Sequence, residues 1–181
     1  VERSRGLGDV YKRQQGYLSK LKVKIVLIKH KEKLFEGYQD EMDYLVEHEP
    51  RNKFIKNLAK DLKGNTLILF NYVEKHGLPL YNMINSDTER PVYFVHGGVD
   101  TEDREEIRLL TEKSDNSIIV ASYGTFSTGI NIRNLHNVIF ASPSKSRIRN
   151  LQSIGRVLRK GDNKSKATLY DIADDLSLIH I

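Results

Sequence analysis

Two arginines, a glutamine and a glycine stand at fixed spacing within residues 151–160, which read L-Q-S-I-G-R-V-L-R-K. If this stretch is helical throughout, Gln152, Arg156 and Arg159 share one face, and its apolar residues fall on the opposite face. If Gly155 instead ends the helix, the arginines follow on a turn. In either case two planar, permanently charged guanidinium groups suit bidentate binding of phosphate oxygens. The alternative interpretation is an amphipathic helix with a solvated basic face.

Polar or glycine-rich residues follow four of the apolar runs in the chain. Asn71 follows the run at residues 66–70, and residues 96–98 (His-Gly-Gly) follow the run at residues 92–95. The two glycines let a backbone or ligand approach closely, with N–H groups free to face an anion. The alternative is a tight turn that binds no ligand. The third loop, residues 122–131, offers hydroxyl groups and glycines to phosphates, or is a flexible polar connection. The fourth, residues 142–146, leads towards the arginines and can serve simply as the N-cap of their helix.

Strand and helix patterns alternate along the chain and place these loops at one edge of a sheet. Apolar patterns predict strands at residues 21–28, 66–70, 92–95, 117–121, 137–141 and 167–172, the first entering a buried sheet. Helical spacing predicts helices at residues 33–49, 54–62, 72–84 and 101–114, with Pro50 ending the first and Gly64-Asn65 closing the second. This alternation predicts an α/β fold with a mainly parallel sheet flanked by helices. Ligands then belong at the carboxyl ends of the strands.

Composition narrows the class of protein. The length of 181 residues suits one domain with a proper core. The absence of cysteine excludes disulfides and thiolate zinc sites and fits a reducing compartment. The histidines show no metal-ligand pairing, so no metal site is expected. No apolar run approaches the ~20 residues that a membrane helix needs, so we expect a cytoplasmic protein that does not bind membranes.

Both ends of the sequence lack a structural periodicity. Residues 6–14 resemble translated sequencing-adapter read-through, and residues 177–181 look like the same kind of scar. We therefore predict that residues 1–14 and 177–181 are non-native, and exclude them. Residues 1–14 hold four basic and two acidic side chains, which leaves +3 of the formal charge of +5 for the rest. That charge permits a nucleic-acid partner without demanding one, and the chain is expected to be a fragment of a longer protein.

The loops and the arginines, in this order on an α/β frame, resemble the C-terminal RecA-like domain of superfamily 2 helicases. Residues 70–71 look like the end of motif IV, residues 96–98 like the glycine turn after it, residues 122–132 like motif V, and residues 152–159 like motif VI. The sequence around these motifs is most similar to UvsW-type phage DNA helicases. If the gene is a phage gene, the expected location is the cytoplasm of the host cell.

This resemblance implies a role for each matching residue. Arg156 and Arg159 would reach the γ-phosphate of ATP, one of them as arginine finger, and Gln152 would add polar contacts. The residues implied in nucleotide binding are Thr128, Gly129 and Asn131, the last of which is Asp in many relatives. The residues implied in binding the nucleic-acid backbone are Asn71, Gly97, Gly98, Ser122 and Thr125. The implied partners are DNA, with RNA as the alternative, and an N-terminal RecA-like lobe of the same full-length protein that holds most of the contacts to Mg²⁺.

Two further helicase signatures are missing from this chain. No G-x-x-x-x-G-K-[ST] occurs, so there is no P-loop to bind the β- and γ-phosphates. Residues 40–43 read D-E-x-D, but they fall inside a predicted amphipathic helix, with Met42 on the apolar side and the acids facing water, so we do not assign them to Mg²⁺. We therefore expect that this chain alone neither hydrolyses ATP nor binds it tightly.

The predicted domain division follows from these assignments. Residues 15–64 are expected to be a strand and helices leading from the N-terminal lobe, and residues 65–176 the helicase C-terminal domain. The expected function is that of the C-terminal motor lobe of an ATP-dependent helicase or translocase. The alternative is a stand-alone nucleic-acid-binding α/β domain without nucleotide chemistry, which the modest charge and the lack of a stacking series of aromatic residues disfavour.

Overall fold

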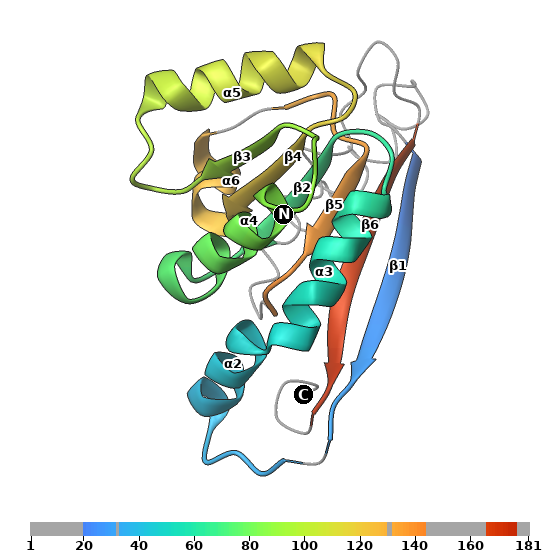
Figure 1. The fold of residues 1–181 in the computed structure, drawn as a ribbon, viewed down its shortest axis with the longest axis vertical. Coiled ribbons are helices and arrows are strands. Elements are labelled where there is room, and N and C mark those ends of the chain that lie inside the picture. Colours follow the sequence, from blue (N-terminus) through green and yellow to red (C-terminus); the bar gives the residue numbers. More distant parts are fainter. Residues whose placement is uncertain (1–19, 32, 130–131, 144–165, 177–181) are drawn as a thin grey trace, which may run out of the picture.

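The computed structural model describes residues 20–31, 33–129, 132–143 and 166–176, and Figure 1 shows its ribbon. These residues form a six-stranded sheet of order β1-β6-β5-β2-β4-β3. The strands are β1 (Lys20–Lys29), β2 (Thr66–Phe70), β3 (Val92–Val95), β4 (Ile118–Ser122), β5 (Asn137–Phe140) and β6 (Lys166–Asp175). Each neighbouring pair runs parallel. The predicted α/β fold with a parallel sheet is confirmed, and each predicted strand is found within a few residues of its expected bounds.

Helices cover both faces of the sheet (Figure 1). They are α2 (Tyr38–Glu47), α3 (Glu49–Asp61), the π-helix η1 (Val73–Gly77), α4 (Leu78–Asn85), α5 (Thr101–Lys113) and α6 (Tyr123–Gly129). Helices α3 and α4 pack against Ile68 and Phe70 of β2, whereas α5 and α6 pack against the face that carries Leu67 and Leu69. All five residues of β2 are buried because helices cover both of its faces, which explains its unbroken apolar sequence.

Strand β1 departs from the prediction of a buried strand. It lies at the edge of the described sheet and pairs with β6 along its whole length. Val26 and Ile28 pack against the core beneath α3, but Ile25 on the opposite face is 72% exposed. The prediction of burial was wrong because alternation of side chains identifies a strand but does not reveal its place in the sheet. The pairing with β6 also makes β1 part of the same sheet as the strands after residue 65.

The first predicted helix is shorter than its apolar spacing indicated. Helix α2 begins at Tyr38 because Gly37 before it has an extended backbone, and Leu34 in the preceding segment is 98% exposed. Pro50 lies in the first turn of α3, where its missing N–H breaks no helical hydrogen bond. The chain therefore turns at His48 between two helices, as the proline predicted. Among the described ranges, no helix has the length and apolar content needed to cross a membrane.

Candidate nucleotide and nucleic-acid site

The loops predicted to bind ligands lie at the carboxyl ends of four neighbouring strands. Asn71 follows β2, residues 96–98 follow β3, and Ser122 ends β4. Because these parallel strands are adjacent in the sheet with β5, the loops that follow them share one edge. Thr128 and Gly129 form the last turn of α6 at the same edge. Asn131, Gln152, Arg156 and Arg159 lie outside the described residues.

The hydroxyl groups of Ser122 and Thr125 cap the start of α6. The Ser122 hydroxyl donates to Thr125 Oγ1 at 2.8 Å and accepts the Thr125 backbone N–H at 3.3 Å. This is the usual arrangement of a serine at a helix N-cap, which satisfies one of the N–H groups of the first turn. Thr125 is buried and Ser122 is half-buried, so the cap fixes the entry of α6 at the end of β4.

The glycine turn after β3 is open on its outer side. A side chain added at Gly97 would meet no atom within 4 Å, and Gly97 has no left-handed backbone that would require glycine. The Gly98 N–H is bound to His96 Nδ1 at 3.1 Å, and Arg104 of α5 donates to the Gly97 carbonyl at 2.9 Å. Packing within the described residues therefore does not explain Gly97, whereas a ligand that approaches the backbone would explain it.

Asn71 binds to the segment that follows β5. Its backbone N–H donates to Ser142 Oγ at 3.1 Å, and its side-chain Nδ2 donates to the Pro143 carbonyl at 3.1 Å. The buried Tyr123 hydroxyl at the start of α6 donates to the Ser142 carbonyl at 3.2 Å. Burial raises the pKa of Tyr123, which keeps it a neutral donor. Ser142 thus links the ends of β2, β4 and β5.

His76 of the π-helix η1 extends this network into the core. Its Nδ1 lies 2.7 Å from Ser142 Oγ, and its Nε2 lies 3.1 Å from Asn52 Oδ1 on α3. Asn52 Nδ2 donates to the Val46 carbonyl at 2.9 Å, which directs the oxygen of the same amide towards His76. His76 must therefore donate from Nε2 and accept at Nδ1 from the Ser142 hydroxyl. Burial, and secondarily the charge of Arg51, lower the pKa of His76 to about 3, so the ring is neutral.

A second buried polar cluster lies beside the first. Arg51 Nε and Nη2 donate to the two carboxylate oxygens of Asp174 in β6, each at 2.9 Å. Arg51 Nη1 donates to the carbonyl of Ala141, the residue before Ser142, at 2.6 Å. His30 Nε2 lies 2.8 Å from Asp174 Oδ1. The side chains of Arg51, Asp174 and His30 are fully buried, so the charges of Arg51 and Asp174 depend on these partners.

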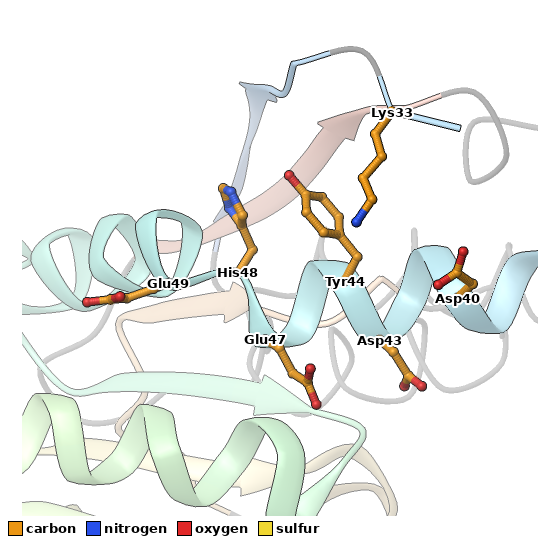
Figure 2. A pocket seen from close by; sticks show the side chains of 7 residues that line it. All are labelled: Lys33, Asp40, Asp43, Tyr44, Glu47, His48 and Glu49. Atoms are coloured by element: carbon orange, nitrogen blue, oxygen red, sulfur yellow. The ribbon is translucent and has the colours of Figure 1, made fainter. Parts of the chain in front are cut away.

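A pocket of about 410 Å³ lies on α2, and Figure 2 shows its lining. Its side chains are Lys33, Asp40, Asp43, Tyr44, Glu47, His48 and Glu49. The Lys33 ammonium group lies 4.3 Å from the centre of the Tyr44 ring, on the side of α2 away from Asp43 and Glu47 (Figure 2). Asp43 binds Lys75 of η1 at 3.0 Å, and this hydrogen bond lowers the pKa of Asp43. The contact between Asp43 and Lys75 connects α2 to η1.

The D-E-x-D sequence lies within α2, as its apolar spacing predicted. Met42 is buried and Asp40 is exposed, but Glu41 is fully buried, so the expectation that all the acids face water was wrong. Glu41 precedes the buried Leu45 by one helical turn and shares its side of the helix. In the parts of the chain that the structure describes, no three histidine, aspartate or glutamate side chains are grouped to hold a metal ion.

Comparisons with known proteins decide the family. The family described as "Helicase conserved C-terminal domain" matches residues 49–161, well over half of the chain and the whole stretch from α3 to the arginines. The chain belongs to this family. The described part of this helicase domain is a parallel sheet with flanking helices, as in RecA-like domains.

Named relatives agree with this assignment. The chain is 38% identical over 169 residues to an ATP-dependent DNA helicase, uvsW of Enterobacteria phage T4. The matched region covers 89% of this chain and 33% of that protein. A putative ATP-dependent RNA helicase of Acanthamoeba polyphaga mimivirus is 33% identical over 128 residues, covering 68% of this chain and 23% of that one. The chain thus spans a third or less of the length of these relatives.

Solved structures show the same fold. The crystal structure of T4 UvsW superposes with a TM-score of 0.72 at 39% identity, over 87% of this chain and 33% of that chain. A yeast DEAD-box splicing factor superposes with a TM-score of 0.62 over 87% of this chain and 30% of that chain, at 18% identity, a level that supports the fold alone.

Sequence reasoning missed the residues that connect the loops. His76, Asn52 and Arg51 are buried polar side chains on helices whose apolar spacing was the only signal used, and Ser142 was interpreted only as a possible cap. His76 lies 24 residues from Asn52 and 66 residues from Ser142 in the chain, and Arg51 lies 123 residues from Asp174. Periodicity reports only local neighbours, so it gives no signal for such contacts.

Proposed function

We propose that this domain is the C-terminal motor lobe of an ATP-dependent nucleic-acid helicase or translocase, with DNA as the favoured partner. The observation that supports it is the shared edge of the sheet. Asn71, Gly97 and Ser122 lie at the carboxyl ends of adjacent parallel strands, next to the exit of β5, from which the chain continues to Arg156 and Arg159. The relative named as an ATP-dependent DNA helicase favours DNA over RNA because it is the more similar one.

The proposed nucleic-acid contacts are backbone contacts. Gly97 presents open backbone on the outer side of its turn. Asn71 follows β2, Ser122 ends β4, and Thr125 lies in the first turn of α6. Contacts to phosphates and sugars fix the position of a strand but do not read its sequence. This lobe is therefore expected to bind nucleic acid without sequence preference.

The proposed nucleotide contacts come from motifs V and VI. Arg156 and Arg159 would bind the γ-phosphate, with Gln152 adding polar contacts and Thr128, Gly129 and Asn131 lying near the ribose. Guanidinium groups stabilise the charge that develops on the transferred phosphoryl group. The resemblance to helicases assigns the contacts to Mg²⁺ mainly to the N-terminal lobe of the full-length protein, and no step in this lobe depends on the metal.

Steady-state ATP hydrolysis tests this function. The chain alone should show no turnover above background, because it lacks the P-loop that holds the β- and γ-phosphates. The full-length protein should hydrolyse ATP faster when single-stranded DNA is added. Turnover by the isolated chain that Arg156→Ala abolishes would contradict the proposal, as would full-length protein whose ATP hydrolysis ignores both DNA and RNA.

A further inference from the structure

Three loops of the proposed motor site are connected through one buried residue, Ser142. Ser142 Oγ receives the backbone N–H of Asn71 and lies 2.7 Å from His76 Nδ1. The backbone of Ser142 accepts the Tyr123 hydroxyl and donates to the Leu69 carbonyl of β2 at 3.4 Å. Ser142 is 1% exposed and His76 is 0% exposed, so water cannot replace either partner.

The polarity of this chain of hydrogen bonds is fixed at its inner end. Asn52 uses its Nδ2 on the Val46 carbonyl, so its Oδ1 requires the Nε2–H tautomer of His76. That tautomer leaves Nδ1 as an acceptor, which the Ser142 hydroxyl fills. The Ser142 hydroxyl hydrogen is then used in the bond to His76, and the hydroxyl oxygen accepts the Asn71 N–H. One side chain, His76, thus decides how Ser142 can hold the loop after β2.

The position of His76 is fixed by its own turn. The N–H groups of His76 and Gly77 both donate to the Tyr72 carbonyl, at 3.2 and 2.8 Å, which makes the π-helical turn η1. A side chain at Gly77 would collide with the ring of Phe70 at the end of β2. A π-turn of this kind is rare and is frequently found at functional sites.

We propose that His76 is a positioning residue that couples the nucleic-acid loop at Asn71 to the exit of β5 at Ser142–Pro143. This inference rests on the proposed function. A strand bound at Asn71 acts on Ser142 and Pro143 directly, and His76 holds Ser142 in the one orientation that transmits the contact. Because the chain continues from Pro143 towards Gln152 and the arginines, the same junction transmits nucleic-acid binding to ATP hydrolysis.

Two substitutions at His76 separate the two bonds of the ring. In His76→Asn the amide oxygen replaces Nδ1 and can still accept from Ser142, whereas the bond to Asn52 is lost. In His76→Gln the amide nitrogen replaces Nε2 and can still donate to Asn52, whereas the bond to Ser142 is lost. Each variant removes one buried hydrogen bond, so the two are matched in their cost to folding.

The measurement is the ratio of DNA-stimulated to DNA-free turnover by the full-length protein, with thermal melting as the measure of folding. His76→Gln should lower this ratio about tenfold, and His76→Asn should leave it within about twofold, since one hydrogen bond is worth about 1.4 kcal/mol or less in a barrier. Ser142→Ala, which removes the junction without touching His76, should behave like His76→Gln. If His76→Gln fails to fold, Ser142→Ala carries the test.

The outcomes separate the inference from the proposed function. If the wild-type protein shows DNA stimulation but all three variants keep its ratio, or the two His76 variants lose it equally, His76 is only structural and the inference is overturned. If the wild-type protein shows no stimulation by DNA or RNA, the proposed function fails and the inference fails with it.

Discussion

Arg51 and Asp174 show how a charge can be buried in this fold. Both side chains are fully buried, and their two hydrogen bonds of 2.9 Å join α3 to β6 across the exit of β5. The attraction between the charges is strong at this depth, but it mainly offsets the free energy that their desolvation costs. The pair is therefore sensitive to the loss of one partner and tolerant of the loss of both.

We predict that Arg51→Met lowers the free energy of unfolding by about 3–5 kcal/mol, because it leaves the Asp174 carboxylate buried with a weaker partner. Combining it with Asp174→Leu should recover much of this loss. The control is Lys53→Met. The Lys53 side chain is 58% exposed and its partner Glu49 is 67% exposed, so losing this ion pair should lower the free energy of unfolding by less than about 1 kcal/mol. Urea denaturation measures all three, and a double variant no more stable than Arg51→Met would contradict the prediction.

The neutral ring of His76 makes stability depend on pH. Its pKa is lowered from 6.5 to about 3 by burial, with a smaller contribution from Arg51, so between these values the unfolded chain binds a proton that the folded chain does not. The free energy of unfolding must then fall as pH is lowered through this window, by up to about 1.4 kcal/mol per pH unit.

His76→Gln removes this titratable group and should make the free energy of unfolding less dependent on pH. We predict that the variant is less stable than wild type near pH 7, and that the difference in stability narrows as the pH falls towards about 4. The reason is that protonation of His76 in the unfolded chain destabilises the wild-type protein at low pH, whereas the variant has no histidine at this position. Urea denaturation at several pH values measures this. Parallel curves for the two proteins would show that His76 titrates normally.

At the scale of elements, the π-helix η1 depends on a glycine. We predict that Gly77→Ala lowers the free energy of unfolding by about 1–3 kcal/mol, because the added methyl group meets the Phe70 ring, with Cε1 at 2.7 Å. Gly97→Ala is the matched control: it has open space around it and should change stability by less than about 0.5 kcal/mol. Equal melting temperatures for the two variants would rule out close packing of η1 on β2.

The sequence predicted most elements because local patterns determine them. Strands β2 and β4 are buried on both faces, so their apolar runs stand out, and the loops after them could be assigned to one edge from parallel topology alone. The exposure of β1 could not be predicted, since an edge strand and an inner strand differ in their neighbours and not in their period. Helix α2 was extended too far because Leu34 matched the helical spacing while lying in solvent.

At the scale of the whole molecule, the candidate site was predictable as a set of loops but not as a connected unit. The motifs identified Asn71, Gly97 and Ser122 because each has a distinctive residue type after an apolar run. The connection through His76 and Ser142 arises only when residues 66 positions apart meet in the core, and no motif records it. The hydrogen-bonded connection between the loops is therefore a property of the fold.

We propose that this domain is one half of a motor. In this proposal its described edge contacts nucleic acid, and its arginines lie in the stretch that the family match includes. An arginine finger increases the rate of phosphoryl transfer by roughly 10³–10⁵-fold once the rest of the site is assembled. We therefore expect the lobe to contribute to ATP hydrolysis only when the two proposed halves of the nucleotide site close together.

The most direct measurement is DNA-stimulated ATP hydrolysis by the full-length protein in which Arg156 and Arg159 are both alanine. We predict that the maximal rate falls roughly 10³-fold or more, and that single-stranded DNA binding in the absence of nucleotide is retained within a few-fold. A double variant that hydrolyses ATP at the wild-type rate would contradict the central claim that this lobe completes the nucleotide site.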